Sequence, residues 1–244
     1  MRGTLTIFKR ELSGYFATPV AYVFLIIFLI LSGVFTWQLG SYYDLNQADL
    51  RGFFQFHPWL YLALIPALSM RLWAEERRSG TIELLMTLPI STASAVAGKF
   101  LAAWAFTGVA LLLTATNWLS VNYLGDPDNG VIAASYIGSF LMAGGFLALG
   151  SALSSLTKNQ ISAFVLTFSV SLLFVLAGFP AVTDSVSGWA PNWLTESVRN
   201  LSFLTHFDAI TRGVVDARDA LYFLSLIALA LFATAIVIDL KKAD

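Results

Sequence analysis

Long uncharged apolar runs alternate with short charged segments along this chain. A membrane-spanning helix needs about 20 mainly apolar residues, because each residue advances the helix axis by about 1.5 Å. The pattern therefore predicts an all-α, polytopic membrane protein that forms a single transmembrane domain over residues 1–244. Six spans are predicted, at residues 19–40, 52–70, 100–125 with a start near Ser91, 131–157, 159–183 and 220–238.

The segment before the first span is predicted to be an amphipathic helix over residues 4–17. Its apolar residues recur near helical spacing, and its charged residues lie off that stripe. Such a helix lies in the headgroup plane of a bilayer; a frayed N-terminal tail is the alternative. The apolar run that follows is too long for the core of a signal peptide, so we expect a retained membrane anchor. The stripe comprises Leu5, Phe8, Leu12, Tyr15 and Phe16, and the charged residues beside it are Lys9, Arg10 and Glu11.

The positions of lysine and arginine predict the orientation of the spans. Six spans place both termini on one side of the membrane. With the N-terminus inside, ten of the 14 lysines and arginines lie in inner segments and four in outer segments. Lysine and arginine accumulate on the cytoplasmic side of membrane proteins. Both termini and the segment between the second and third spans are therefore expected in the cytoplasm.

Composition excludes several classes of protein. Of the 244 residues, 57% are hydrophobic and only 12% are charged, whereas a soluble domain carries about 25% charged residues. The net charge of −1 makes nucleic acid an unexpected partner. Cysteine is absent, which excludes disulfides, thiolate metal sites and cysteine nucleophiles.

Motifs for catalysis or for nucleotide binding are missing as well. The chain has no G-x-x-x-x-G-K-[ST] loop for ATP, no H-E-x-x-H and no G-x-S-x-G. Its two histidines, His57 and His206, are 149 positions apart and do not suggest a zinc site. We therefore expect no enzyme activity, no cofactor and no metal on this chain.

The segment between the second and third spans is a densely charged hairpin, residues 74–89. Trp73 is predicted to anchor the preceding span at the membrane interface. The charged residues after it should extend that helix into water, with Glu75 and Arg78 paired three residues apart. A helix break is expected at Ser79 and Gly80.

The second half of this charged hairpin is predicted to be a short amphipathic helix over residues 81–88, ended by Pro89. Glu83 lies in its first turn, where the positive end of the helix dipole favours an acid. Ile82, Leu85 and Met86 should share one face. We interpret the pattern as a ledge parallel to the membrane that docks a soluble partner; a solvated loop is the alternative. Ser91 or Thr92 is expected to cap the third span.

The stretch EERRSGTIELLMTLPIS resembles the signature E-x-x-x-G-T-x-E-x-L-x-x-x-P of ABC-2-type transporter permeases, with an architecture like that of type V exporters. The matching positions are Glu76, Gly80, Thr81, Glu83, Leu85 and Pro89. The resemblance implies that the amphipathic helix is the coupling helix, which seats in a cleft of the nucleotide-binding subunit. The expected contact surface comprises Glu75, Glu76, Arg77, Arg78, Gly80, Thr81, Ile82, Glu83, Leu85 and Met86.

The same resemblance implies the partners and the location. Two P-loop ATPase subunits per complex would carry ATP and Mg, and a second permease copy or a paralogue would complete the path. Membrane lipid surrounds it, and a periplasmic or accessory subunit is a further expectation. The implied location is the bacterial inner membrane. Residues 201–225 resemble the segment before the last span in a bacterial subgroup of gliding-motility-type permeases.

The long connection before the sixth span, residues 181–219, is predicted to hold two short helices on the outer leaflet. Trp189 and Trp193 suit the interface. Asp208, Arg212 and Asp216 are spaced by four residues, which predicts a ladder of ion pairs on one helix face. His206 is expected to be hydrogen-bonded rather than to bind a metal. The family resemblance implies re-entrant helices that form a lid; a surface lid without substrate contact is the alternative.

Two further features bear on function. The fourth span is rich in small residues, which predicts either close packing within the chain or a path or subunit seam. The spans carry no charge at mid-depth, which argues against ion-coupled transport. A permease subunit that couples ATP hydrolysis to substrate movement, with export the expected direction, is favoured. A membrane scaffold without transport is the alternative, and a membrane-bound enzyme is disfavoured.

Overall fold

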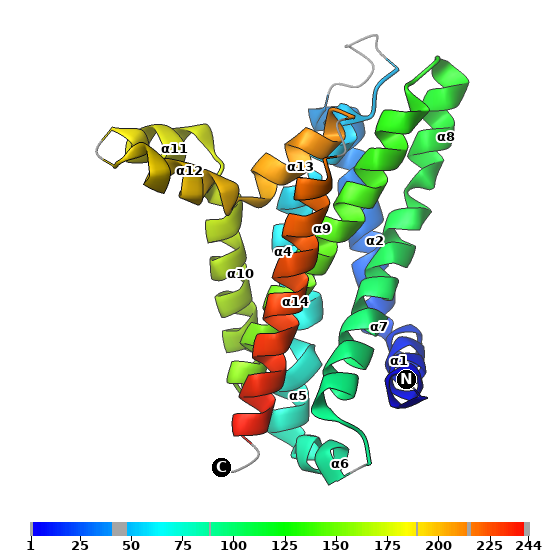
Figure 1. The fold of residues 1–244 in the computed structure, drawn as a ribbon. Helices are drawn as coiled ribbons and strands as arrows, with labels where there is room; N and C mark the ends of the chain where they lie inside the picture. Colours follow the sequence, from blue (N-terminus) through cyan, green and yellow to red (C-terminus); the bar gives the residue numbers. More distant parts are fainter. Residues whose placement is uncertain (1, 41–47, 88, 189, 214–215, 242–244) are drawn as a thin grey trace.

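The computed structural model describes residues 2–40, 48–87, 89–188, 190–213 and 216–241. All regular elements in this part of the chain are helical, as predicted, and Figure 1 shows most of them running side by side. The longer elements are α1 (Arg2–Ala17), α2 (Pro19–Val34), α4 (His57–Ser69), α7 (Thr92–Leu113), α8 (Ala115–Leu124), α9 (Asn129–Leu156), α10 (Gln160–Leu176) and α14 (Ala217–Leu240). The shorter ones are the π-helical η1 (Phe35–Leu39), α3 (Arg51–Gln55), α5 (Arg71–Ser79), α6 (Thr81–Thr87), α11 (Pro180–Ser187), α12 (Asn192–Asn200) and α13 (Phe203–Thr211).

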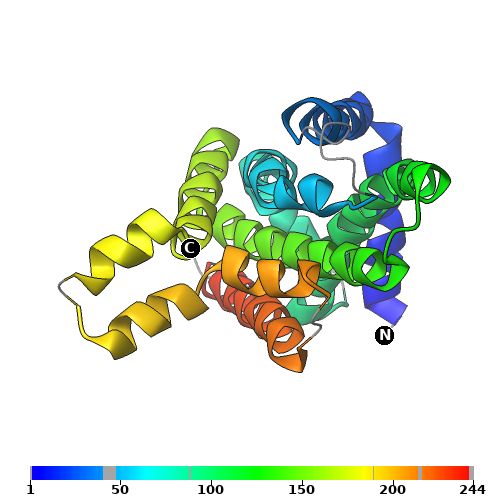
Figure 2. The ribbon, with the colours of Figure 1, turned by 90° about the horizontal axis from the view of Figure 1, so that it is seen from above.

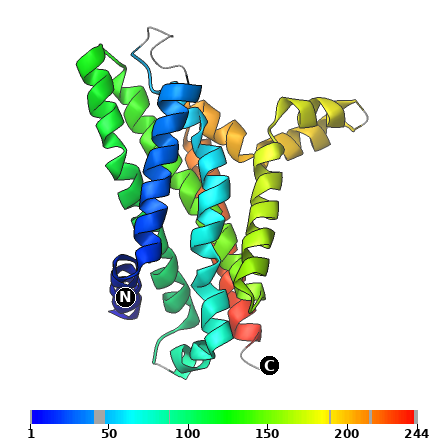
Figure 3. The ribbon, with the colours of Figure 1, turned by 180° about the vertical axis from the view of Figure 1, so that it is seen from behind.

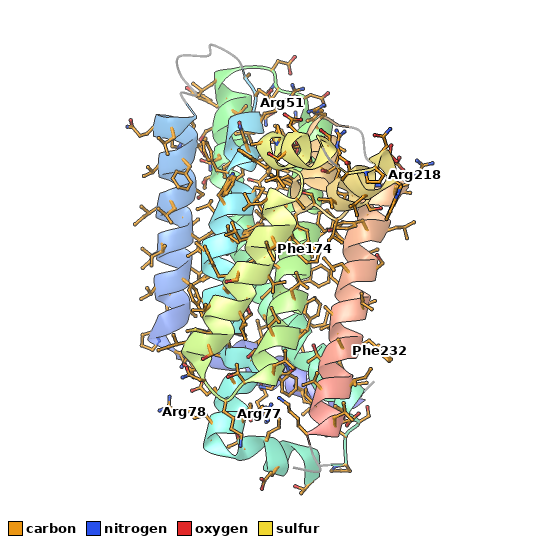
Figure 4. All side chains as sticks on the ribbon, turned by 90° about the vertical axis from the view of Figure 1, so that its left-hand side faces the viewer. Arg51, Arg77, Arg78, Phe174, Arg218 and Phe232 are labelled. Atoms are coloured by element: carbon orange, nitrogen blue, oxygen red, sulfur yellow. The ribbon has the colours of Figure 1, made fainter. Side chains whose placement is uncertain are left out.

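Charged residues gather at the two ends of the bundle. Figure 4 shows Arg77 and Arg78 at one end, which we call the hairpin end, and Arg51 and Arg218 at the other, which we call the arm end. α1 and the end of α14 both lie toward the hairpin end (Figure 1). This placement agrees with the prediction of an even number of crossings.

α1 lies across the other helices instead of along them, as Figure 3 shows. It packs on α7, and the side chain of Ile7 is buried there against the backbone of Gly98. Leu5 and Phe16 remain exposed on the other side of the helix. The predicted amphipathic helix is therefore present, and its geometry fits a position in the headgroup plane.

Within the described ranges, four helices are long and apolar enough to span a membrane. They cover residues Ala21–Leu39, Thr92–Leu124, Asn129–Leu156 and Ala217–Leu240, and α10 is apolar but shorter, with 17 residues. The predicted fifth span, residues 159–183, is too long at its C-terminal end, because α10 ends at Leu176 and α11 begins at Pro180. The count of six spans stays a prediction, which would require α10 and the segment of α3 and α4, the predicted span at residues 52–70, to cross as well.

Polar residues cap the starts of α7, α9, α10 and α14. Ser91 accepts a hydrogen bond from the Ser94 amide at 3.2 Å, which confirms the predicted cap of α7. Asp128 caps α9 and Asn159 caps α10 in the same way. These side chains satisfy amide groups that have no partner inside the helix.

α9 is the central helix of the bundle. It packs against α4, α5, α7, α10, α13 and α14. Its small residues allow this, as Gly150 shows: a Cβ atom there would lie 2.1 Å from the Ser69 hydroxyl oxygen. The small-residue stripe of the fourth span thus serves helix packing within the chain, the first of the two predicted roles.

Candidate functional site

The charged hairpin forms the outermost structure at the hairpin end. α5 ends at Gly80, whose φ of 73° is left-handed and favours glycine. α6 then starts at Thr81 and runs across the bundle direction (Figure 4). The predicted helix, break and second helix are therefore confirmed; α6 covers Thr81–Thr87, and Leu88, the last residue of the predicted helix, lies outside the described residues.

α5 is fixed to the central helix α9 through Ser154 and Ser155. The backbone amides of Trp73 and Ala74 both donate to the Ser154 hydroxyl oxygen, at 3.2 and 3.1 Å. These amides belong to the first turn of α5, where intrahelical partners are missing. The Arg77 guanidinium donates to the Ser155 carbonyl oxygen at 2.6 Å. α5 therefore cannot shift without disturbing the adjoining end of α9.

Trp73 is not an interface anchor, so that prediction is wrong. Its side chain is fully buried, and its indole N–H donates to the Ser151 hydroxyl at 3.0 Å. A buried indole needs a partner for its N–H. The small residues of α9 admit the large ring and supply that partner.

A charged cluster joins α1, α5 and α7. The Lys99 ammonium lies 3.1 Å from the Glu11 carboxylate and 2.9 Å from the Glu76 carboxylate. The Lys99 side chain is only 4% exposed, against 19% for Glu11 and 18% for Glu76. Arg10 pairs with Glu11 at 2.6 Å. We call Arg10, Glu11, Glu76 and Lys99 the junction cluster; its charges balance.

Glu76 also controls the start of α6. The Thr81 hydroxyl donates to its second carboxylate oxygen at 2.6 Å. Burial alone would raise the pKa of Glu76, but the Lys99 charge and the bonds from Thr81 and Lys99 outweigh it, so the pKa lies below its ordinary value. The carboxylate is therefore held in its charged form, between Lys99 on α7 and Thr81 on α6.

Half of the junction cluster, Glu11 and Lys99, lies outside the predicted contact surface. Glu11 lies off the predicted apolar stripe of α1, and Lys99 lies in the first half of α7. A signal existed in Lys99, because a lysine within an apolar helix needs a partner. The identity of that partner depends on how α1 folds back over α7, which spacing along the chain does not show.

A cavity of about 550 Å³ opens beside the junction cluster, between α1, α5 and α7. Its wall is mixed, with charged, hydroxyl and apolar groups. The lining residues are Arg10, Glu11, Gly14, Tyr15, Thr18, Arg71, Leu72, Glu75, Glu76, Ser79, Thr81 and Lys99. Part of the predicted contact surface therefore borders a hollow between α1 and the charged hairpin.

The remaining predicted residues of the charged hairpin are placed as follows. Glu75 pairs with Arg71 at 3.0 Å and not with Arg78, so the predicted pair is wrong; the spacing of four residues gives the better approach on a helix. Arg78 and Glu83 are exposed, and Ile82 packs partly buried against the core. The side chains of Leu85 and Met86 lie outside the described part of the structure.

The arm end differs from its prediction. Three short helices, α11, α12 and α13, replace the expected two. The ladder of Asp208, Arg212 and Asp216 does not exist, because α13 ends at Thr211 and Asp216 instead caps α14 by accepting from the Arg218 amide at 3.0 Å. The left-handed backbone of Gly213, with φ of 84°, separates the two helices.

Of the aromatic residues predicted for the lid, Trp193 is 67% exposed on α12 and Trp189 lies outside the described residues. His206 is hydrogen-bonded, as expected, through Nδ1 to Asp219 and through Nε2 to the Asn200 carbonyl. Within the described residues no group of His, Asp and Glu is arranged to hold a metal ion.

The sequence matches a known family of proteins. A family model described as an ABC-2 family transporter protein matches residues 46–240. The match covers most of the chain, including the charged hairpin and Lys99, and it leaves out α1 and with it Glu11. No curated protein matches the sequence.

Proposed function

The chain belongs to the ABC-2 family of transporter proteins, and from that premise we propose that it is a permease subunit coupling ATP hydrolysis on a separate subunit to substrate export. The family match supports a multi-pass permease in the membrane. The proposal adds that the hairpin end faces the cytoplasm of a bacterium, that six segments cross the inner membrane, and that the ATPase subunits carry the ATP and Mg.

One observation carries the coupling proposal. The charged hairpin protrudes at one end of the bundle, and yet it is bonded to α9 through Ser154 and to α1 and α7 through the junction cluster. A force applied to α6 would therefore reach three membrane-associated helices. A solvated loop without these bonds would move under the same force without displacing the helices. The bonds of the charged hairpin to the bundle therefore support a mechanical role for it.

The proposed contact surface is the exposed side of the charged hairpin. Glu75, Arg78, Gly80, Thr81 and Glu83 are exposed there. In our proposal, two P-loop ATPase subunits dock below a pair of permeases, formed with a second copy or a paralogue. α11, α12 and α13, with Trp193, Asp208 and Arg212, would form the lid of the path at the opposite end.

The test is a charge reversal on α6. Glu83→Arg places a positive charge on the proposed contact surface, where a like charge or a lost pair costs several kcal/mol. We expect ATP hydrolysis by the co-purified ATPase to lose its stimulation by at least tenfold, with normal membrane insertion. The matched control is Asp126→Arg, the same reversal of charge at an exposed site in the loop between α8 and α9.

Equal stimulation in Glu83→Arg and Asp126→Arg would refute the docking surface. A preparation of the intact chain that contains no P-loop ATPase, with dissociation excluded by crosslinking before extraction, would instead favour the alternative function, a membrane scaffold that binds a soluble partner.

A further inference from the structure

α11 and α12 form a hairpin, residues 180–200, which extends sideways from the arm end of the bundle, as Figures 1 and 2 show. We call it the arm. None of the described residues of α12 is buried, so little apolar packing fixes its position. The end of α12, at Asn200 and Leu201, leads directly into α13 and the bundle. Bonds at this junction therefore decide how the arm is held.

His206 of α13 lies at the junction and bonds in two directions. Its Nδ1 is 2.6 Å from the Asp219 carboxylate on α14, and its Nε2 is 2.9 Å from the Asn200 carbonyl oxygen of α12. The His206 side chain is 14% exposed and that of Asp219 is 11% exposed. The Tyr222 ring stacks on the imidazole with centroids 3.9 Å apart. One imidazole thus connects α12, α13 and α14.

Both partners of this imidazole are acceptors. A carbonyl oxygen can only accept, and an ionised carboxylate can only accept, so both ring nitrogens must supply a proton. A neutral imidazole carries one N–H, and either tautomer would leave a nitrogen lone pair facing an oxygen lone pair. The two bonds therefore need one proton more than a neutral histidine and an ionised aspartate possess, whether that proton resides on Nδ1 or on the carboxyl group.

Loss of that proton should break one particular bond of the two that the imidazole makes. The bond between an imidazole N–H and a carboxylate is charge-assisted and stronger than a bond to a backbone carbonyl. The remaining proton should therefore stay on Nδ1 toward Asp219, and the Nε2 contact to Asn200 should break. The Tyr222 hydroxyl still donates to the Leu201 carbonyl at 2.5 Å, so the arm would pivot about Leu201 while α13 stays joined to α14.

We propose that His206, Asp219 and the Asn200 carbonyl form a proton-operated clamp: the protonated clamp holds the arm, and its deprotonation lets the arm pivot about Leu201. The clamp therefore responds to the proton concentration at the membrane face where the arm lies. The proposal does not depend on the ATPase partner or on the direction of transport.

Other charged groups lie near this clamp. Arg199 precedes Asn200 on α12, Asp208 follows on α13, and Arg218 begins α14. The ring itself contacts the Asp219 carboxylate, the Asn200 carbonyl and the rings of Tyr222 and Phe223. Asp208 and Arg218 are exposed, so their charges are screened by water and salt.

The experiment measures distances in the full-length chain in lipid nanodiscs, with any subunits that co-purify. The natural sequence has no cysteine, so spin labels can be placed at will. One label pair, Glu196→Cys and Tyr123→Cys, reports the arm against α8; the second, Arg212→Cys and Tyr123→Cys, reports the end of α13 against the same reference. All three sites are exposed.

Between pH 5 and pH 9 we expect the first distance distribution to shift or broaden and the second to stay unchanged. The loss of the Nε2–H bond to the Asn200 carbonyl should change the ratio of held to pivoted arm by roughly tenfold. A first distribution that is the same at both pH values would overturn the proposal, as would equal changes in both label pairs.

Two substitutions predict opposite outcomes. His206→Gln cannot hold the proton, so the arm should show its high-pH distribution at every pH. Asp219→Asn should fix the arm in its held state at every pH, because the introduced carboxamide can donate to Nδ1 and leave Nε2–H for Asn200. Asp208→Asn is the control and should keep the normal pH response. A purely structural role would give the same pivoted state in both variants and so contradict the clamp.

Discussion

Removal of the Lys99 charge tests whether the junction cluster fixes the charged hairpin to the bundle. Lys99→Met keeps the length and apolar character of the stem and deletes the ammonium group. The nearby carboxylates of Glu11 and Glu76 then lose their shared cation. Glu11 retains its pair with Arg10 at 2.6 Å, so Glu76 becomes the group without a cation.

The magnitude follows from burial. Breaking a fully buried pair costs about 3–5 kcal/mol, because an uncompensated charge stays behind, whereas an exposed pair contributes about 0–1 kcal/mol. The Lys99 side chain is 4% exposed and that of Glu76 is 18% exposed, so the expected cost lies between these limits, at about 2–3 kcal/mol. For a chain of this size that corresponds to roughly 4–12 °C in the midpoint of thermal unfolding.

The assay is thermal unfolding in nanodiscs, combined with hydrogen exchange of α6. Lys99→Met should lower the midpoint and raise amide exchange in residues 81–87, because Glu76 no longer holds Thr81 in place. Lys9→Met is the matched control; Lys9 is exposed on α1, and the change should stay within about 0.5 kcal/mol. The double variant Lys99→Met with Glu76→Gln should recover at least half of the loss. Unfolding of Lys99→Met at the same temperature as Lys9→Met would refute the role assigned to the junction cluster.

Two further predictions concern pH and packing. The pKa of Glu76 lies below its ordinary value of 4.5, so the contribution of this carboxylate to stability is present above pH 4.5 and is lost as the pH falls through the folded-state pKa. The difference in unfolding temperature between the natural chain and Glu76→Gln should therefore shrink below pH 4.5. A difference that stays constant from pH 7 to pH 3.5 would contradict this prediction. Gly150→Ala should destabilise the fold by about 1–3 kcal/mol, because the new Cβ atom would lie 2.1 Å from the Ser69 hydroxyl oxygen. Gly14→Ala on α1 has nothing within 4 Å of its new Cβ atom and should be neutral or slightly stabilising by helix propensity. Equal unfolding temperatures of the two variants would show that α9 and α4 can separate at no cost.

The sequence predicted the helices of this fold well, because hydrophobic runs and helix breakers act locally. The break at Gly80 and the cap at Ser91 depend on neighbouring residues only, and both are confirmed. α10 was predicted too long, because the apolar composition continues past Leu176 through Gly178 and Pro180 into α11.

The contacts that individual side chains make were predicted less well than the helices. Glu75 pairs with Arg71, one turn before it, and not with Arg78 as expected. The expected ladder of ion pairs from Asp208 does not form because α13 ends at Thr211. Trp73 was assigned to the interface by residue type, but Ser151 of α9 provides a buried partner for it. The Trp73 error concerns which surface another helix covers, and that depends on a contact 78 residues away along the chain.

The position of α9 shows how the two ends of the molecule can be linked. At the hairpin end, Ser154 and Ser155 of this helix bind α5. At the arm end, Gly138 lies directly against Ile210 of α13, within one turn of His206. A helix of 28 residues is about 42 Å long, and it is buried along much of its length, so it can move as a rigid body but cannot easily bend. A displacement of α5 by a docked partner would therefore act on α13 through α9, and a displacement of α13 would act on α5, as linkage between two sites requires. The Arg212–Tyr123 distance, which reports the end of α13, is then a readout of the charged hairpin, and Ser154→Ala, which leaves two amides of α5 without their partner, is the substitution that should weaken it.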